Sequence, residues 1–150
     1  MEIEFRLRFI DCVKSSEEGD ELYVQVGGQR DDGSKLDPIG YPAHGVWKLS
    51  SGQSTGPNET LYEGELDQGL TLDVRFREED ARGFISLADD YIGGLELEIM
   101  TDGAHRFSPG KQTEDLGTTG NVHKFRMTGS DAEYVVEFQL FEKRSLIGSN

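Results

Sequence analysis

The sequence has a single cysteine, Cys12, which excludes an internal disulfide framework because a bridge needs two thiols. It also lacks any apolar run near the roughly 18 residues that a membrane-spanning helix needs. The N-terminal stretch from Met1 to Arg6 alternates charged and apolar residues, which is typical of a strand and not of a secretory signal. These absences predict a protein without a transmembrane segment, made in a reducing compartment and cytoplasmic by default. Export by a signal-free route stays open.

Basic residues are scarce as well. The chain has 15 Lys and Arg against 29 Asp and Glu, which gives a formal net charge of −14 at pH 7. Affinity for nucleic acids comes largely from Lys and Arg that displace counterions from the phosphates, so we expect no nucleic-acid partner. The same charge repels anionic lipid head groups unless a cation lies between the two surfaces.

Alternation of apolar and polar residues dominates the sequence, and helical periodicity is not evident. Together with 19 glycines, which favour many turns, this pattern predicts an all-β fold: an antiparallel, eight-stranded β-sandwich. Residues 27–45 are rich in Gly, Asp, Ser and Pro and are predicted as a long loop. The length fits one domain, residues 1–143, followed by a polar tail, residues 144–150. The eight predicted strands cover residues 3–9, 22–26, 46–49, 61–66, 70–77, 95–99, 123–127 and 134–140.

Two catalytic or metal-binding patterns are incomplete. Gly52-Gln53-Ser54-Thr55-Gly56 matches G-x-S-x-G, but no helix follows to form a nucleophile elbow, so a surface turn is expected. Asp31-Asp32-Gly33 is similar to the start of an EF-hand loop. The glycine and the bidentate glutamate which that loop requires are replaced by Leu36 and Pro42, so a solvated turn is expected here too.

The remaining chemistry-bearing residues do not form a catalytic pattern. His44, His105 and His123 are scattered, with no pair at the spacing of metal ligands. His123 lies on the apolar face of a predicted strand, which indicates a hydrogen-bonded core histidine, and Cys12 is interpreted as a small buried apolar residue. Without a pair of nucleophile and base, we expect the protein not to be an enzyme.

Acidic residues gather at the ends of two predicted strands. One group precedes the strand at residues 22–26, and the other follows the strand at residues 70–77 and continues before Tyr91. A sandwich could bring both groups to one end, where they would repel one another unless a divalent cation neutralised them. Ca²⁺ accepts six to eight oxygen ligands in flexible geometry, which suits carboxylates from separate loops. The two groups are Glu17, Glu18, Asp20 and Glu21, and Glu78, Glu79, Asp80, Asp89 and Asp90.

These two acidic segments resemble the calcium loops of the C2-type family, the calcium- and phospholipid-binding β-sandwich domains. Gly19-Asp20-Glu21-Leu22-Tyr23-Val24 is similar to the aspartate and the D-x-Y-V strand at the first loop of that family. Arg77-Glu78-Glu79-Asp80 and Asp89-Asp90-Tyr91-Ile92-Gly93 are similar to the D-x-D and D-x-I-G parts of the third loop. Glu78 replaces the first aspartate, and nine residues separate Asp80 from Asp90, so the resemblance is to a distant or variant member.

The resemblance implies a non-enzymatic binding module of C2-like fold that binds Ca²⁺ and presents a surface to a lipid, glycan or protein partner. The implied ligands are Asp20, Glu78, Asp80 and Asp90, with Asp89 and Glu17 in reserve. Phe84 and Ile85, in the apolar stretch at residues 83–87, are the implied contact residues, unless this stretch folds back onto the sandwich.

Two other functions are compatible with the sequence. One is a metal-independent structural or adaptor β-sandwich in a larger assembly, in which the acids serve solubility. The other is a carbohydrate-binding sandwich, which needs aligned exposed aromatic residues; the candidates are Trp47, Tyr41, Tyr62 and Tyr23. A common fold does not choose among these functions.

Overall fold

The computed structural model describes residues 1–79 and 90–143, and the regular structure in these ranges is entirely β-strand. The described residues contain no helix that could span a membrane. The strands, in chain order, are β1 (Glu2–Lys14), β2 (Asp20–Arg30), β3 (Lys35–Tyr41), β4 (Trp47–Leu49), β5 (Ser54–Thr55), β6 (Glu59–Glu65), β7 (Leu70–Glu78), β8 (Asp90–Ile99), β9 (His105–Pro109), β10 (Thr113–Thr119), β11 (Val122–Met127) and β12 (Glu133–Glu142).

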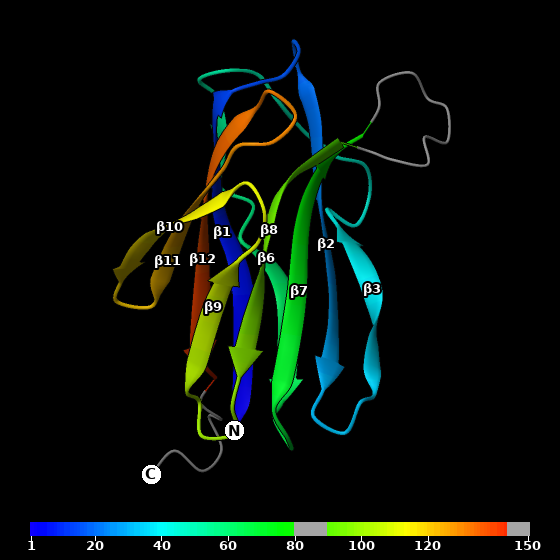
Figure 1. Ribbon diagram of the computed structural model, residues 1–150, viewed down its shortest axis with the longest axis vertical. Coiled ribbons are helices and arrows are strands. Elements are labelled where there is room, and N and C mark those ends of the chain that lie inside the picture. The colour runs from blue at the N-terminus through cyan, green and yellow to red at the C-terminus, as the bar shows by residue number, and fades with distance from the viewer. Residues whose placement is uncertain (80–89, 144–150) are drawn as a thin grey trace.

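The strands form two antiparallel sheets of six strands each, which makes the fold the all-β sandwich that the alternation predicts. In the first sheet the order is β10-β11-β12-β1-β5, and β6 also pairs with β1. In the second sheet the order is β3-β2-β7-β8-β9, and β4 also pairs with β2. Figure 1 shows β3, β2 and β7 side by side at the right, and the β10–β11 hairpin projecting at the left.

The expected number of eight strands is too low, because the described residues contain twelve. Residues 27–45, predicted as a loop, include the end of β2 and all of β3, joined by a tight turn. In that turn the backbone N–H of Ser34 donates to Asp32 Oδ1 at 2.8 Å, so the EF-hand-like Asp31-Asp32-Gly33 is a hairpin turn. β3 and β10 lie at sheet edges with most of their side chains exposed on both faces, so they lack the alternation that reveals a half-buried strand.

One apolar core fills the space between the sheets. Its centre is aromatic: the ring centroids of Phe5 and Phe138 are 5.2 Å apart, and those of Phe76 and Phe138 are 6.1 Å apart. Cys12 is fully buried in this core, as the sequence predicts, and burial raises the pKa of its thiol. Other side chains with at most 1% exposure come from both sheets and include Leu7, Ile10, Leu22, Val24, Leu72, Val74, Ile92, Leu97, Ile99, Phe125, Met127, Tyr134 and Val136.

Strand pairing brings the two acidic segments to one end of the sandwich. β1 belongs to the first sheet and β2 to the second, so residues 15–19, which connect them, cross from one sheet to the other. β2 pairs with β7 in a register that sets Leu22 opposite Glu78, and the backbone N–H of Glu79 donates to the carbonyl of Glu21 at 2.8 Å. The β1–β2 connection and the end of β7 both lie at the top of Figure 1.

Candidate metal centre

Three carboxylates meet where the β1–β2 connection passes the end of β7. Glu17 and Asp20 come from the connection and the start of β2, and Glu78 is the last residue of β7. One carboxylate oxygen from each of them lies within 4.8 Å of the others. Asp20 and Glu78 are buried and Glu17 is exposed, so the carboxylate cluster (Glu17, Asp20 and Glu78) opens to solvent on the Glu17 side. Asp20 and Glu78 are among the ligands that the sequence implies, and Glu17 is one of the two residues held in reserve.

Asp20 organises this end of the protein through its hydrogen bonds. Its Oδ1 accepts from the Ser16 hydroxyl at 2.8 Å and from the Glu17 backbone N–H at 3.1 Å. Its Oδ2 accepts from the Ser16 backbone N–H at 3.0 Å and from the Tyr134 hydroxyl at 2.8 Å. These four donors match the acceptor capacity of an ionised carboxylate. Asp20 therefore folds the β1–β2 connection back on itself and ties it to β12 of the other sheet.

The Ser16 hydroxyl is shared by two carboxylates. Its Oγ lies 2.8 Å from Asp20 Oδ1 and 2.7 Å from Glu78 Oε2, both within hydrogen-bond distance. A hydroxyl has one hydrogen, so it donates to only one of these carboxylates at a time. The contact with the other requires a proton on that carboxylate or a cation close by.

Glu78 is the carboxyl that best accommodates the extra proton. Its pKa is raised to about 8, mainly by burial and further by the neighbouring carboxyl of Glu17 and the charge of Asp20, while the hydrogen bond with Ser16 acts in the opposite direction. Without a cation, Glu78 is therefore largely protonated at neutral pH and donates to Ser16 Oγ, which in turn donates to Asp20. A divalent cation in the same place would remove the need for that proton.

The ligand chemistry of the carboxylate cluster consists of oxygen alone. Carboxylate and hydroxyl oxygens suit hard cations such as Ca²⁺ and Mg²⁺, whereas Zn²⁺ and Cu²⁺ favour nitrogen or sulfur. Glu78 and Glu17 have more free acceptor capacity than Asp20, whose oxygens already take four hydrogen bonds. We therefore expect Glu78 and Glu17 to be the stronger ligands and Asp20 to fix the loop that presents them.

The other predicted site residues do not join the carboxylate cluster in the described part of the chain. Asp90 is exposed and lies opposite Glu78 in the β7–β8 pairing, but its carboxylate is not among the converging oxygens. The remaining predicted ligands, Asp80 and Asp89, and the predicted contact residues, Phe84 and Ile85, lie outside the described residues.

Close packing accounts for the rest of the Asp90–Gly93 motif. Ile92 is fully buried in the core, and the Tyr91 hydroxyl donates to the carbonyl of Lys111 at 3.2 Å. A Cβ added to Gly93 would lie 2.6 Å from the side chain of Met127 in the opposite sheet. This segment is therefore needed for sheet-to-sheet packing, whether or not a cation binds nearby.

Two residues of the site escape the sequence analysis. Ser16 carries no signal beyond its position four residues before Asp20, a residue type whose side chain often accepts from a nearby backbone N–H, as Asp20 does from Ser16. Tyr134 lies 114 residues from Asp20 in the sequence, and its position in the alternating pattern of β12 indicates only a residue on the buried face of that strand. Its contact with Asp20 depends on long-range packing, since Tyr134 pairs with Cys12 in the first sheet and Asp20 begins β2 in the second.

The chain matches no protein-family model and no curated protein sequence at a significant level, so the carboxylate cluster itself is the basis for assigning a function.

Proposed function

We propose that this protein is a non-enzymatic, C2-like binding module whose acidic end binds Ca²⁺ and presents a surface to a partner. One observation carries the proposal: Asp20 and Glu78, both buried and 58 positions apart in the chain, both lie within hydrogen-bond distance of the Ser16 hydroxyl, which has one hydrogen to donate. Such an arrangement needs a proton or a cation, and Glu17 adds an exposed carboxylate from the solvent side.

Ca²⁺ suits the carboxylate cluster better than Mg²⁺ does. Ca²⁺ accepts mono- and bidentate carboxylates in irregular geometry, whereas Mg²⁺ demands near-ideal octahedral geometry and keeps several waters. The cluster combines Asp20, which is fixed by hydrogen bonds, with carboxylates from two separate segments. Its ligand atoms therefore have the irregular geometry that Ca²⁺ tolerates.

The partner proposed for the acidic end is a lipid, glycan or protein that binds when Ca²⁺ is present. The formal net charge of −14 opposes contact with an anionic surface. A bound Ca²⁺ supplies positive charge at the carboxylate cluster. It could bridge the carboxylates of the protein to phosphate or hydroxyl oxygens of the partner. Phe84 and Ile85, which lie outside the described residues, remain the proposed contact residues.

The first experiment is thermal unfolding at constant ionic strength, after chelation and then with millimolar Ca²⁺ or Mg²⁺. A ligand that binds only the native state at 100 times its Kd stabilises that state by about 2.7 kcal/mol. For a chain of this size we expect Tm to rise by roughly 5–10 °C with Ca²⁺ and by clearly less with Mg²⁺. Constant ionic strength matters because any salt screens the repulsion within so acidic a protein.

Matched variants test which carboxylates are responsible for the Ca²⁺-dependent rise in Tm. Glu78→Gln keeps the shape of a protonated glutamate but cannot become an anionic ligand, and Glu17→Gln removes the exposed carboxylate. Both should abolish or strongly reduce the Ca²⁺-dependent rise in Tm. Glu18→Gln makes the same charge change at the next residue of the loop and should leave that rise intact. An unchanged response in Glu78→Gln would contradict the ligand assignment.

A metal-independent structural or adaptor module is the second candidate, and one observation favours it. Asp20 is already satisfied by four protein donors, and a proton on Glu78 completes the hydrogen bonding around Ser16. In that case chelator and Ca²⁺ leave Tm unchanged, while Glu78→Gln still folds. Self-association measured by sedimentation would then become the next experiment.

A further inference from the structure

Two of the three histidines meet across the gap between the sheets, although 17 residues separate them in sequence. His105 begins the edge strand β9 of the second sheet, and His123 lies in β11 of the first sheet. Their ring centroids are 5.4 Å apart and their planes are nearly perpendicular, at 88°. The spacing in the sequence gave no reason to pair them, because sheet packing alone brings β9 and β11 together.

The surroundings of this histidine pair differ on its two sides. His123 is 6% exposed and packs against Phe107, with ring centroids 4.3 Å apart, as expected for a core histidine. His105 is exposed and contacts the same Phe107 ring edge-on at 5.8 Å. The pair therefore has an apolar wall behind it and an open side toward solvent.

Each imidazole has its Nδ1 directed at an oxygen atom. The Nδ1 of His105 lies 3.4 Å from the carbonyl oxygen of Gly103, and a carbonyl only accepts, so the neutral ring carries its hydrogen on Nδ1. The Nδ1 of His123 lies 2.8 Å from Thr118 Oγ1, which fixes the orientation of that ring. The Thr118 hydroxyl can accept from His123 Nδ1, and in that tautomer both Nδ1 atoms donate and the two Nε2 atoms keep their lone pairs. This arrangement is typical of histidines that bind metals, whose second ring nitrogen donates to a protein oxygen.

Imidazole binds a metal as the neutral base. Burial lowers the pKa of His123, and the proximity of His105 lowers it further, while the charge of Asp115 on β10 acts in the opposite direction.

We propose that His105 and His123 form a second cation site, separate from the acidic end, for a divalent transition metal of the Zn²⁺ type. Imidazole nitrogen selects Zn²⁺, Ni²⁺ or Cu²⁺ over Ca²⁺, so this site and the carboxylate cluster favour different ions. The two imidazoles supply two ligands from opposite sheets, and water or a group from outside the chain fills the other positions. With two protein ligands, we expect weaker binding than at Zn²⁺ sites with three or four.

The test is a calorimetric titration of the untagged full chain with Zn²⁺, in excess Ca²⁺ so that the carboxylate cluster is occupied by the competing ion. We expect one Zn²⁺ per chain at the histidine pair. His105→Ala removes an exposed ligand and should weaken binding at least tenfold. His44→Ala is the matched control, since His44 is the third histidine and is exposed in the loop after β3; it should bind Zn²⁺ as the unaltered chain does.

A second variant and an NMR measurement on the unaltered chain distinguish loss of the metal site from misfolding of His105→Ala. Thr118→Val keeps both imidazoles and the side-chain shape but removes the oxygen beside His123 Nδ1, and should weaken binding roughly tenfold. In NMR spectra of the unaltered chain, the imidazole signals of His105 and His123 should shift together with Zn²⁺ while those of His44 stay. Absence of Zn²⁺ binding, full binding by His105→Ala, or a shift of His44 alone would each overturn the proposal.

Discussion

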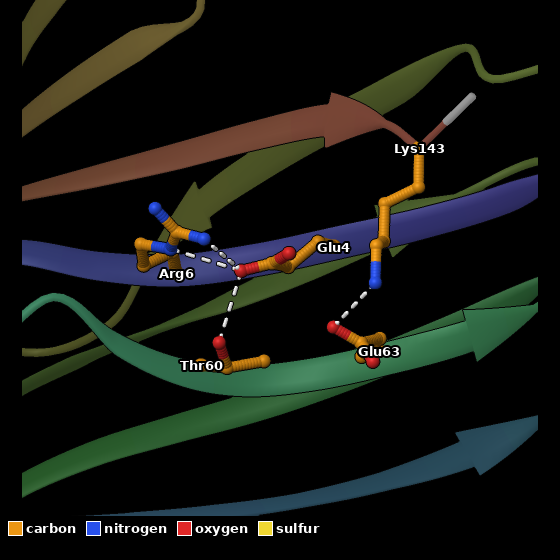
Figure 2. A network of polar contacts seen from close by, with 5 residues as sticks. All are labelled: Glu4, Arg6, Thr60, Glu63 and Lys143. Atoms are coloured by element: carbon orange, nitrogen blue, oxygen red, sulfur yellow. Dashed lines mark hydrogen bonds and ion pairs between the residues drawn. The ribbon is translucent and has the colours of Figure 1, made fainter. Parts of the chain in front are cut away.

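At the scale of single residues, the least expected side chain is a glutamate buried on the outer face of a sheet. Glu4 is only 4% exposed, and its Oε2 accepts hydrogen bonds from Arg6 Nε at 2.9 Å, Arg6 Nη2 at 2.6 Å and Thr60 Oγ1 at 2.9 Å (Figure 2). Burial works to raise the pKa of Glu4, but the hydrogen bonds from Arg6 and Thr60 outweigh it, and the net direction is downward. Arg6 in turn lies over the ring of Phe141, 5.4 Å from its centroid.

Glu4→Gln should therefore destabilise the protein in a pH-dependent way. A carboxyl whose folded pKa is lower than its unfolded pKa contributes stability above the unfolded value, and loses it as the pH falls through the folded value. At pH 7 we expect a loss of about 1–3 kcal/mol in the free energy of unfolding, measured with urea. The difference between the variant and the unaltered chain should shrink as the pH falls below the unfolded pKa of glutamate.

The control for Glu4 lies in the same view. Glu63 pairs with Lys143 at 2.9 Å, but both side chains are substantially exposed (Figure 2). Glu63→Gln should change the free energy of unfolding by less than about 1 kcal/mol, because exposed ion pairs contribute little. Equal effects of Glu4→Gln at pH 7 and pH 3 would show that packing, not charge, explains the loss.

At the scale of elements, β8 contains a glycine that lies close against the neighbouring strand β7. A Cβ on Gly94 would lie 2.4 Å from the carbonyl oxygen of Val74 in β7, and the Gly94 backbone N–H donates to Thr113 Oγ1 at 2.9 Å. Gly94→Ala should lower the free energy of unfolding by about 1–3 kcal/mol, because backbone atoms have to move. Gly40→Ala in the edge strand β3, where nothing lies within 4 Å of the added carbon, should be close to neutral. Urea unfolding of both variants checks this, and equal losses would contradict it.

The elements also separate what the sequence could predict from what it could not. β1, β7, the second half of β8 and β12 were predictable because each buries one face, so apolar residues recur at every second position. The edge strands β3 and β10 were not predictable. Few of their side chains are buried, so burial leaves no alternating pattern in their sequence. The position of Asp90 opposite Glu78 follows from the β7–β8 register, in which an irregularity between Phe76 and Arg77 shifts the pairing.

At the scale of the whole molecule, the prediction of a sandwich explains why part of the site was predictable as well. Antiparallel pairing of β2 with β7 brings the acids before one strand to the acids after the other, so Glu17, Asp20 and Glu78 could be anticipated together. The contacts that define their chemistry could not. They involve Ser16 and Tyr134, whose roles depend on how the β1–β2 connection crosses from one sheet to the other and packs on β12.

The burial of Cys12 has a kinetic consequence for the molecule as a whole. It is the one thiol in the chain, is fully buried between the sheets, and pairs across strands with Tyr134 beside Asp20. A thiol reagent can therefore react only when the sandwich opens, and its rate reports how often that happens without any introduced label. We expect alkylation of the native chain to be roughly 10³- to 10⁶-fold slower than that of the chain in urea. Any ion or partner that holds the two sheets together should slow this reaction in proportion to its stabilisation, so Cys12 acts as a built-in reporter of opening.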